Sequence, residues 1–339
     1  MTSEQIHSMV AEGGFPGPSA PVDLVETHIS WVILTPTFAF KIKKPVRFPF
    51  LDFSTLEKRA HYCLEELRLN RRLAPDMYLD VLPIIFSKNG IPAISQTAAD
   101  EAAMDFAVAM KRMDNGLQMD KLLRQHAVTL ANMETLAAML ARFHRTSVLD
   151  GQTLDYEPSS HRADFDDLFR LEATAQKVSG AAASKQFEAW RNQVGTFLNK
   201  HEPRLHERAL RGFWVEGHGD LHARNIFLLP QGPVVFDCIE FNPHFRQLDV
   251  LNELAFLCMD LEANGHPELA AAFMKAYCHH WPCLENAEDE RLFLYFKAYR
   301  ANVRLKVALT EWEQHPAPTL EASAATYQAL LARYLQALE

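Results

Sequence analysis

The chain has 339 residues, which is long for a single hydrophobic core, so its length favours two packed units. A hydrophobic fraction of 48% and a charged fraction of 23% are ordinary for a globular protein, while 34 basic against 43 acidic residues argue against general nucleic-acid binding. No apolar run is long enough to span a membrane, and the N-terminus lacks the pattern of a signal peptide. Five scattered cysteines suit a reducing compartment, so we expect a cytoplasmic protein without membrane or nucleic-acid partners.

The first third of the chain predicts a β-rich region. After a short helix over 3–12 and a Gly/Pro-rich linker, β-rich runs cover roughly 22–26, 29–34 and 37–44. The last run alternates, so Lys41 faces the same way as Ala39. Taken alone, the lysines near the end of this strand are more simply explained as a solvated edge.

The next segment predicts an amphipathic helix from Ser54 to about Leu73. Ser54 is the expected N-cap, and Glu57 would complete a capping box with it. The inward-facing residues of this helix are Leu56, Ala60, Cys63, Leu67 and Asn70. Glu66 lies beside this stripe, and a buried carboxylate needs a cation, so we predict an ion pair between Glu66 and Lys41.

Beyond this helix, strands are expected near 79–86 and 104–112, with a less certain stretch over 91–103 between them. Strand patterning stops at Asp114-Asn115-Gly116, which we interpret as a connector between two lobes. The chain contains no G-x-G-x-x-G, and the absence of G-x-x-x-x-G-K-[ST] excludes a P-loop within this sequence. The expected helices that follow are 128–145, 160–178, 182–210, 266–281, 286–312 and 319–337.

A predicted hairpin in the middle of the chain carries the polar residues that indicate chemistry. The β-rich runs 225–229 and 233–236 flank a Pro-Gln-Gly turn, and pairing them places Asn225 beside Asp237. Asp220 lies in a polar loop just before the hairpin. Oxygen-only ligands suit Mg²⁺, and phosphoryl transfer needs a carboxylate to orient the attacking hydroxyl plus an Asn and an Asp to hold metal on the phosphates.

Two histidines and a Cys/His-rich segment leave transition-metal chemistry open as an alternative. His218 and His222 flank Asp220 and could bind a metal for hydrolysis, although such sites usually gather at least three nitrogen or sulfur ligands. The segment Cys278-His279-His280-Trp281-Pro282-Cys283 places four possible ligands in six residues. No second ligand pair lies nearby in the sequence, so we expect core cysteines at a helix end there.

The segment His218-Gly219-Asp220-Leu221-His222-Ala223-Arg224-Asn225, with Asp237 twelve residues later, resembles the aminoglycoside phosphotransferase and choline kinase-like family. The segments THISWV, FKIKKPV, LDFSTLEKR and EELRLNRRLAP further resemble an uncharacterised bacterial branch of that family. The resemblance implies a two-lobed α+β fold of the protein-kinase type. Residues 1–112 would form a small β-rich nucleotide-binding lobe, and residues 113–339 a larger helical catalytic and substrate lobe.

The resemblance also implies an activity, namely Mg²⁺-dependent transfer of the γ-phosphoryl group of ATP to a hydroxyl of a small molecule. Asp220 would orient and deprotonate the acceptor hydroxyl, while Asn225 and Asp237 would hold Mg²⁺. Lys41, fixed by Glu66, would contact the phosphates. Two other classes stay open: a protein Ser/Thr kinase of the same fold, and a nucleotide-binding module without catalysis.

Further roles follow from the same resemblance. Met110 and Met113 stand before the connector, where a kinase-like fold lines the adenine pocket. His218 would support the loop through hydrogen bonds. Asp249 opens an apolar helix and would brace the catalytic loop, a role compatible with that of an ordinary helix N-terminal carboxylate.

Arg300 stands within the apolar face of the predicted helix over 286–312, and Lys297 and Arg304 border that face. A buried arginine is costly unless a carboxylate or phosphate meets it. An internal partner such as Asp249 or Glu253 is one explanation. The alternative is that the three cations face the acceptor pocket and favour an anionic or hydroxyl-rich acceptor.

Overall fold

The computed structural model describes residues 1–18, 21–97, 103–151, 158–180 and 182–339. Within the described chain, contacts define two compact units. The first consists of residues 1–121 together with 224–246, and the second of 122–223 together with 247–339. The lobe boundary at residues 112 and 113 stays a prediction.

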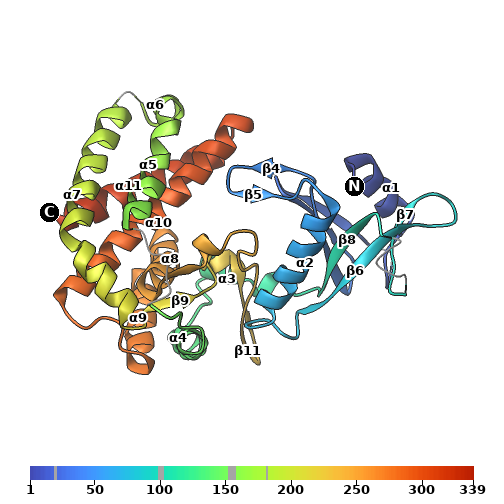
Figure 1. The fold of residues 1–339 in the computed structure, drawn as a ribbon, viewed down its shortest axis with the longest axis horizontal. Helices are drawn as coiled ribbons and strands as arrows, with labels where there is room; N and C mark the ends of the chain where they lie inside the picture. The colour runs from blue at the N-terminus through green and yellow to red at the C-terminus, as the bar shows by residue number, and fades with distance from the viewer. Residues whose placement is uncertain (19–20, 98–102, 152–157, 181) are drawn as a thin grey trace. The chain divides into compact units, whose positions relative to one another are not determined.

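The first unit is built on a six-stranded antiparallel sheet in the order β1-β2-β3-β8-β6-β7 (Figure 1). Helix α2 (Leu56–Asn70) packs against β6 and β8, and α1 (Ser3–Ala11) contacts β7. The strands are β1 (Asp23–Glu26), β2 (Ser30–Leu34), β3 (Phe38–Lys43), β6 (Tyr78–Phe86), β7 (Pro92–Ile94) and β8 (Asp105–Lys111). The strand expectations are therefore confirmed, and β7 falls in the stretch that the pattern left uncertain; residues 98–102 of that stretch lie outside the described residues.

The alternation of β3 separates apolar residues from lysines. Phe40 and Ile42 belong to a hydrophobic cluster that includes Ile6 and Met9 of α1. Ala39 belongs to the other cluster, which includes residues of α2. Because successive side chains of a strand point to opposite faces, Lys41 shares the α2 side of the sheet with Ala39, as predicted.

The start of α2 corrects the expected capping. Thr55 is the N-cap, because its side chain accepts a hydrogen bond from Lys58 N and its backbone is extended. The Ser54 hydroxyl and backbone N–H instead both donate to Asp52 Oδ1, at 2.6 and 3.0 Å. The predicted capping box between Ser54 and Glu57 is therefore wrong, since a local turn with Asp52 engages the serine. The helix also ends at Asn70 rather than near residue 73.

The described residues of the first unit also form two small hairpins and short 3₁₀ turns. The predicted hairpin forms with β10 pairing to β11 and Leu229 opposite Gly232. The bounds are β4 (Arg47–Phe48), β5 (Leu51–Asp52), η2 (Asn115–Leu117), η4 (Ala223–Asn225), β10 (Ile226–Leu229), β11 (Gly232–Val235) and η5 (Pro243–Phe245). Helix α3 (Met119–Arg124) lies where no helix was expected, before the predicted start of helical structure at 128.

The second unit is mainly helical, with one short antiparallel pair of strands, β9 (Trp214–Glu216) and β12 (Gln247–Asp249). Helix α8 (Val250–Ala263) is buried along nearly its whole length and packs against α9 and α10 (Figure 1). The other helices are α4 (Leu130–Arg145), α5 (Pro158–Asp166), η3 (Asp167–Leu171), α6 (Glu172–Ser179), α7 (Ala182–Leu210), α9 (Pro267–His280), α10 (Ala287–Gln314) and α11 (Pro318–Leu338). The helix expected over 160–178 is thus broken by η3.

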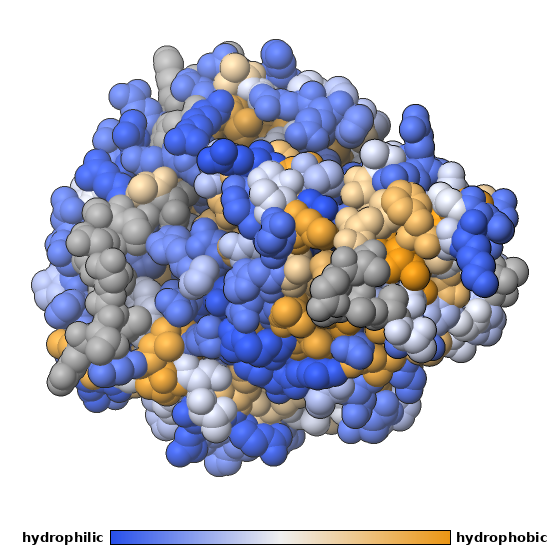
Figure 2. Space-filling model, turned by 45° about the vertical axis from the view of Figure 1, so that its right-hand side comes forward, coloured by the Kyte–Doolittle hydropathy of each residue, from blue (hydrophilic) through white to orange (hydrophobic). Residues whose placement is uncertain are grey.

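Hydrophilic residues cover most of the surface shown in Figure 2, with hydrophobic residues gathered in places. Among the described residues, no helix has the length and apolar character needed to cross a membrane.

Candidate functional site

Lys41 lies at the centre of a charged cluster in the first unit. Its Nζ forms an ion pair with Glu66 Oε1 at 2.9 Å, which is the contact predicted from the sequence. The same Nζ donates to Asp237 Oδ1 at 2.7 Å. Burial works against the charged ammonium, but Asp237 and Glu66 hold the pKa of Lys41 well above its usual value. Strand β3, helix α2 and the segment after β11 therefore meet at one cation.

Lys43 is a second lysine in this cluster, and sequence reasoning missed its role. Its Nζ donates to Glu66 Oε2 at 2.7 Å and also to Glu240. Burial favours the neutral acid, but Lys41 and Lys43 lower the pKa of Glu66 to about 2. The spacing of Lys41 and Lys43 by two residues on one strand was the available signal, since it puts both on one face.

Asp237 follows the hairpin in a conformation that few non-glycine residues adopt. Its φ is +64°, in the left-handed region. Two hydrogen bonds hold this turn: Asp237 N donates to the Tyr78 hydroxyl at 3.2 Å, and Cys238 N donates to Asn70 Oδ1 at 2.9 Å. The Asp237 side chain is 45% exposed, so one face of its carboxylate is open to solvent while Lys41 contacts the other. Backbone strain of this kind is common at functional sites.

Asn225 and Asp237 lie at the same end of the hairpin, as its predicted register requires. Ile226 pairs with Val235, and Phe236 N donates to the Asn225 carbonyl at 3.0 Å, so Asp237 follows the residue opposite Asn225. One carboxylate and one amide supply hard oxygen donors, a set that fits Mg²⁺ completed by water and phosphate oxygens. Among the described residues, no group of three or more His, Cys, Asp or Glu side chains is placed to hold a metal.

The two methionines predicted to line the adenine pocket are both part of the hydrophobic packing between α2 and the sheet. Met110, on β8, is 5% exposed and belongs to the hydrophobic cluster of α2 and the sheet. Met113 is partly buried against the same cluster. Their contact with a base stays a prediction.

Asp220 lies in the second unit, in the loop that follows β9. His222 Nε2 approaches its Oδ2 at 3.3 Å, and Asp220 N donates to His218 Nδ1 at 3.3 Å. Burial favours the protonated acid, but the charges of His222 and His218 and that of Arg304 hold the pKa of Asp220 below its usual value. The carboxylate is thus kept ionised, and its side chain is 36% exposed.

The loop is fixed by Glu253 of α8. His218 N and Gly219 N donate to its two oxygens, at 2.5 and 2.9 Å. Burial opposes the charged form, yet the hydrogen bond with His144 and the loop contacts lower the pKa of Glu253 to about 2. A Cβ at Gly217 would come within 2.7 Å of Glu253 Oε1, so a larger residue there would force the Glu253 carboxylate to move away from the loop.

The predicted bracing role of Asp249 is wrong. Its two oxygens accept from Arg208 Nε and Nη2, at 2.7 and 2.9 Å, and both side chains are fully buried. Asp249 also caps α8 through Leu251 N, so the expected helix-terminal role is confirmed. Glu253, one turn later on α8, contacts the loop instead, because its side chain accepts from the backbone N–H groups of residues 218 and 219.

The three cations of α10 have different partners, and the carboxylate partners named for Arg300 are wrong. Lys297 pairs with Glu262 at 2.8 Å. Arg300 is internal, but it meets neither Asp249 nor Glu253; it donates to Asn252 Oδ1 and to the Gly219 carbonyl. Arg304 is half-buried and donates to the Tyr327 hydroxyl at 3.3 Å. Whether Lys297 and Arg304 face an acceptor stays a prediction.

The Cys/His-rich segment forms the end of α9 and the turn after it. Cys278 Sγ and Cys283 Sγ lie 3.9 Å apart, and Cys283 is fully buried. His279 and His280 are exposed. The expectation of core cysteine at a helix end is confirmed for Cys283.

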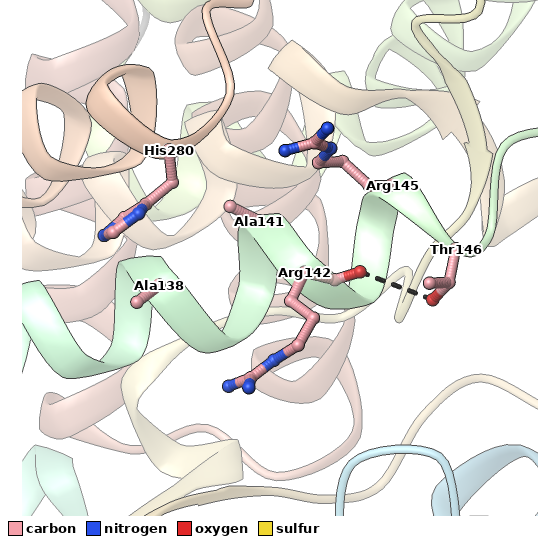
Figure 3. A pocket seen from close by; sticks show the side chains of 6 residues that line it. All are labelled: Ala138, Ala141, Arg142, Arg145, Thr146 and His280. Carbon is pink, nitrogen blue, oxygen red and sulfur yellow. Dashed lines mark hydrogen bonds between the residues drawn. The ribbon is translucent and has the colours of Figure 1, made fainter.

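A cavity of about 280 Å³ lies between α4 and α9 and is lined by Ala138, Ala141, Arg142, Arg145, Thr146 and His280 (Figure 3). The guanidinium groups of Arg142 and Arg145 point in different directions in Figure 3. Among the described residues that line this cavity there is no carboxylate, and we do not assign the reaction to it.

Solved structures with the same arrangement of elements are kinases and phosphotransferases. A choline/ethanolamine kinase family protein from Mesorhizobium loti has a TM-score of 0.53 at 14% identity, covering 100% of this chain and 99% of that one. An aminoglycoside 2'-phosphotransferase-IIIa in complex with GDP has a TM-score of 0.54 at 12% identity, covering 99% of both chains. Ethanolamine kinase from Plasmodium vivax gives 0.55 at 10% identity, covering 96% and 85%. The predicted α+β kinase-like fold is confirmed.

Sequence comparison identifies the family. Uncharacterised proteins of Mycobacterium tuberculosis and Mycobacterium bovis are 31% identical over 321 residues, covering 93% of this chain. The chain spans 60% of the length of these relatives. Residues 57–287 match the model of the phosphotransferase enzyme family, a range that includes Glu66, Asp220 and Asp237. The chain therefore belongs to the phosphotransferase enzyme family.

Proposed function

We propose that this chain transfers the γ-phosphoryl group of ATP to a hydroxyl of a small molecule. The observation that carries the proposal is the contact of Lys41 with both the buried Glu66 and the half-exposed Asp237. Phosphoryl transfer depends on positioning and charge stabilisation, and this cluster supplies a fixed cation beside a carboxylate with an open face. The GDP-bound phosphotransferase of the same fold supports a nucleotide as the donor.

Lys41 rather than Lys43 is the residue assigned to the phosphates. The Lys41 side chain is 12% exposed, whereas Lys43 is 1% exposed and is enclosed by two carboxylates. Glu66 holds Lys41 in place through an ion pair that α2 anchors. The terminal ammonium can then exchange its contact with Asp237 for phosphate oxygens without losing Glu66.

Asn225 and Asp237 are assigned to Mg²⁺, which would neutralise charge on the β- and γ-phosphates when bound. The Asp237 backbone is fixed by Tyr78 and the next residue by Asn70, so the carboxylate direction is set before any ligand arrives. Such preorganisation avoids reorganisation during the reaction.

Asp220 is assigned to the acceptor hydroxyl. Its carboxylate is kept ionised by neighbouring cations and is partly exposed, so it can accept a hydrogen bond from an incoming hydroxyl. His222 Nε2 lies 3.3 Å from Oδ2 of the same carboxylate. A nucleotide-binding module without catalysis would not need such a group.

The test compares two variants in an assay of acceptor-dependent ADP release, run over anionic, neutral and polycationic hydroxyl compounds and a protein substrate. Asp220→Asn should lower turnover by about 10²–10⁴-fold and leave nucleotide affinity unchanged. Asp237→Ala should abolish the Mg²⁺ dependence of binding of a fluorescent ATP analogue, because the main metal ligand is lost.

Near wild-type turnover of Asp220→Asn would show that Asp220 is not the catalytic base. Unchanged Mg²⁺-dependent affinity of Asp237→Ala would make that residue structural. Transfer to the protein substrate alone would favour a protein kinase, and nucleotide binding by the wild type without transfer to any acceptor would favour a binding module.

A further inference from the structure

Arg300 is a buried cation that donates to neutral oxygens, an amide oxygen and a backbone carbonyl. It is 6% exposed, and among the described residues no carboxylate lies within 4.0 Å of its guanidinium. Other buried arginines of the same unit are paired: Arg204 with Asp289 at 2.8 Å and Arg208 with Asp249 at 2.7 Å. Burying a cation without a carboxylate partner is costly, so an uncharged side chain would be more stable at position 300 if the residue served only for packing.

The guanidinium joins two oxygens of different segments. Nε donates to Asn252 Oδ1 on α8 at 2.7 Å, and Nη1 donates to the Gly219 carbonyl at 3.1 Å. Its central carbon also lies 4.6 Å from the ring centroid of Phe256, on the same helix as Asn252. The guanidinium is planar, and Asn252 of α8 holds one of its edges. Its other edge can therefore fix both the position and the direction of the Gly219 carbonyl.

The carbonyl that Arg300 holds belongs to the peptide bond that leads into Asp220. Gly219 has φ +85°, and glycine populates positive and negative φ about equally, so its own backbone does not hold this conformation. Glu253 fixes its N–H and Arg300 fixes its C=O, so side chains restrain the residue from both ends. Because a peptide unit is planar, holding this carbonyl also sets the direction in which the Asp220 backbone starts.

The geometry points to Arg300 as a positioning residue for Asp220: it holds the Gly219–Asp220 peptide so that the carboxylate faces the acceptor hydroxyl. This inference rests on the proposed role of Asp220. Arg300 touches neither substrate nor nucleotide in this role. Misplacing a reacting group by about 1 Å can lower a rate about 10²-fold, which sets the size of the expected effect.

The test uses Arg300→Met, Arg300→Lys and Asn252→Ala, with Lys297→Met as the matched control one turn earlier on α10. Lys297 also forms a partly buried contact, with Glu262 at 2.8 Å, but it does not contact the loop. For each variant we would measure kcat, KM for both substrates, nucleotide affinity, thermal stability and amide exchange of the segment 217–224.

Arg300→Met should lower kcat about 30- to 100-fold, with KM and nucleotide affinity within about threefold of the wild type. Amide exchange in 217–224 should accelerate. Arg300→Lys should recover part of kcat, because an ammonium reaches one of the two oxygens but lacks the fork that joins them. Asn252→Ala keeps the Arg300 guanidinium but removes the side-chain oxygen that Nε donates to, so kcat should fall less than in Arg300→Met and amide exchange should rise less. This variant replaces Arg300→Met in the test if Arg300→Met does not fold.

Lower thermal stability with kcat and loop exchange equal to those of Lys297→Met would overturn the inference, because Arg300 would then be structural only. A rise in acceptor KM with kcat unchanged would also overturn it, since that pattern belongs to a substrate contact. Should the wild type transfer no phosphate, the proposed function fails, whereas the exchange measurement still decides whether Arg300 restrains the loop.

Discussion

At the scale of single residues, burial separates two lysines that look alike in the sequence. Lys41 and Lys43 project from the same face of β3 and share Glu66. Lys43 is enclosed between Glu66 and Glu240, and Lys41 ends beside the open carboxylate of Asp237. The same residue type therefore has a structural role at one position and a proposed ligand-binding role two residues earlier.

This difference in burial predicts that Lys41→Met mainly affects nucleotide binding, whereas Lys43→Met mainly affects stability. Lys41→Met should fold with nearly wild-type stability, because Glu66 keeps its contact with Lys43 and Asp237 is partly open to solvent, but it should weaken nucleotide binding. Lys43→Met should lower the free energy of unfolding by about 3 kcal/mol, because the buried Glu240 loses its cation and Glu66 keeps only Lys41. Urea unfolding and nucleotide titration of both variants would measure this. Equal loss of stability in the two variants would contradict the assignment.

At the scale of elements, α8 acts as the support for the loop around Asp220. Glu253 accepts from the N–H groups of His218 and Gly219, and Asp260 Oδ2 accepts from Ala223 N at 2.9 Å. Phe256 lies between these two residues on α8, and its ring packs edge-on against that of His222 with ring centroids 5.4 Å apart. The positions 253, 256 and 260 lie on one face of a helix, so the loop follows that face from residue 218 to 223.

The start of α8 gives a prediction that separates capping from ion pairing. Asp249→Asn keeps a good N-cap but removes the charge that meets Arg208, so it should lower the free energy of unfolding by about 3 kcal/mol. This is the low end of the range for a broken buried pair, because Asp289 still contacts Arg208 at 3.0 Å. Asp249→Ala should lose about 1 kcal/mol more.

Urea unfolding of the two variants and the wild type would check these values. Stability of Asp249→Asn within about 1 kcal/mol of the wild type would show that the cap, and not the ion pair, is what α8 requires.

At the scale of the whole molecule, a net charge of −9 coexists with carboxylates that are buried and ionised. The pKa values of Glu66 and Glu253 both fall to about 2 from an ordinary value of 4.5. A carboxylate whose pKa is lower in the folded state stabilises the fold above the unfolded pKa. That contribution is lost as the pH falls from about 4.5 towards 2.

We therefore expect the free energy of unfolding to fall on acidification mainly below pH 4.5, with Glu253 accounting for roughly 3 kcal/mol of the change. Glu253→Gln should be less stable than the wild type at pH 7, and the difference should shrink by pH 3. Urea unfolding at several pH values would measure it, with the exposed Glu188→Gln as control. A stability difference that does not change with pH would contradict the linkage.

The sequence by itself determined the features that depend on local pattern. The alternation of β3 placed Lys41 on the face of Ala39, the stripe of α2 placed Glu66 inward, and a turn flanked by two β-rich runs predicted the hairpin. Side-chain direction in a strand or helix follows from its period, so these results need no knowledge of distant partners. The family followed from the 218–225 segment with Asp237 for the same reason, because a contiguous motif is visible in the sequence.

Only the tertiary structure decided which distant groups meet. Lys43 and Glu240 are 197 positions apart, and Arg300 and Gly219 are 81 apart. The bracing role of Asp249 was implied by the resemblance alone, and it failed because the loop's approach to α8 brings Glu253 to the backbone of residues 218 and 219. Periodicity determines which face a side chain occupies, but long-range packing determines what lies opposite that face.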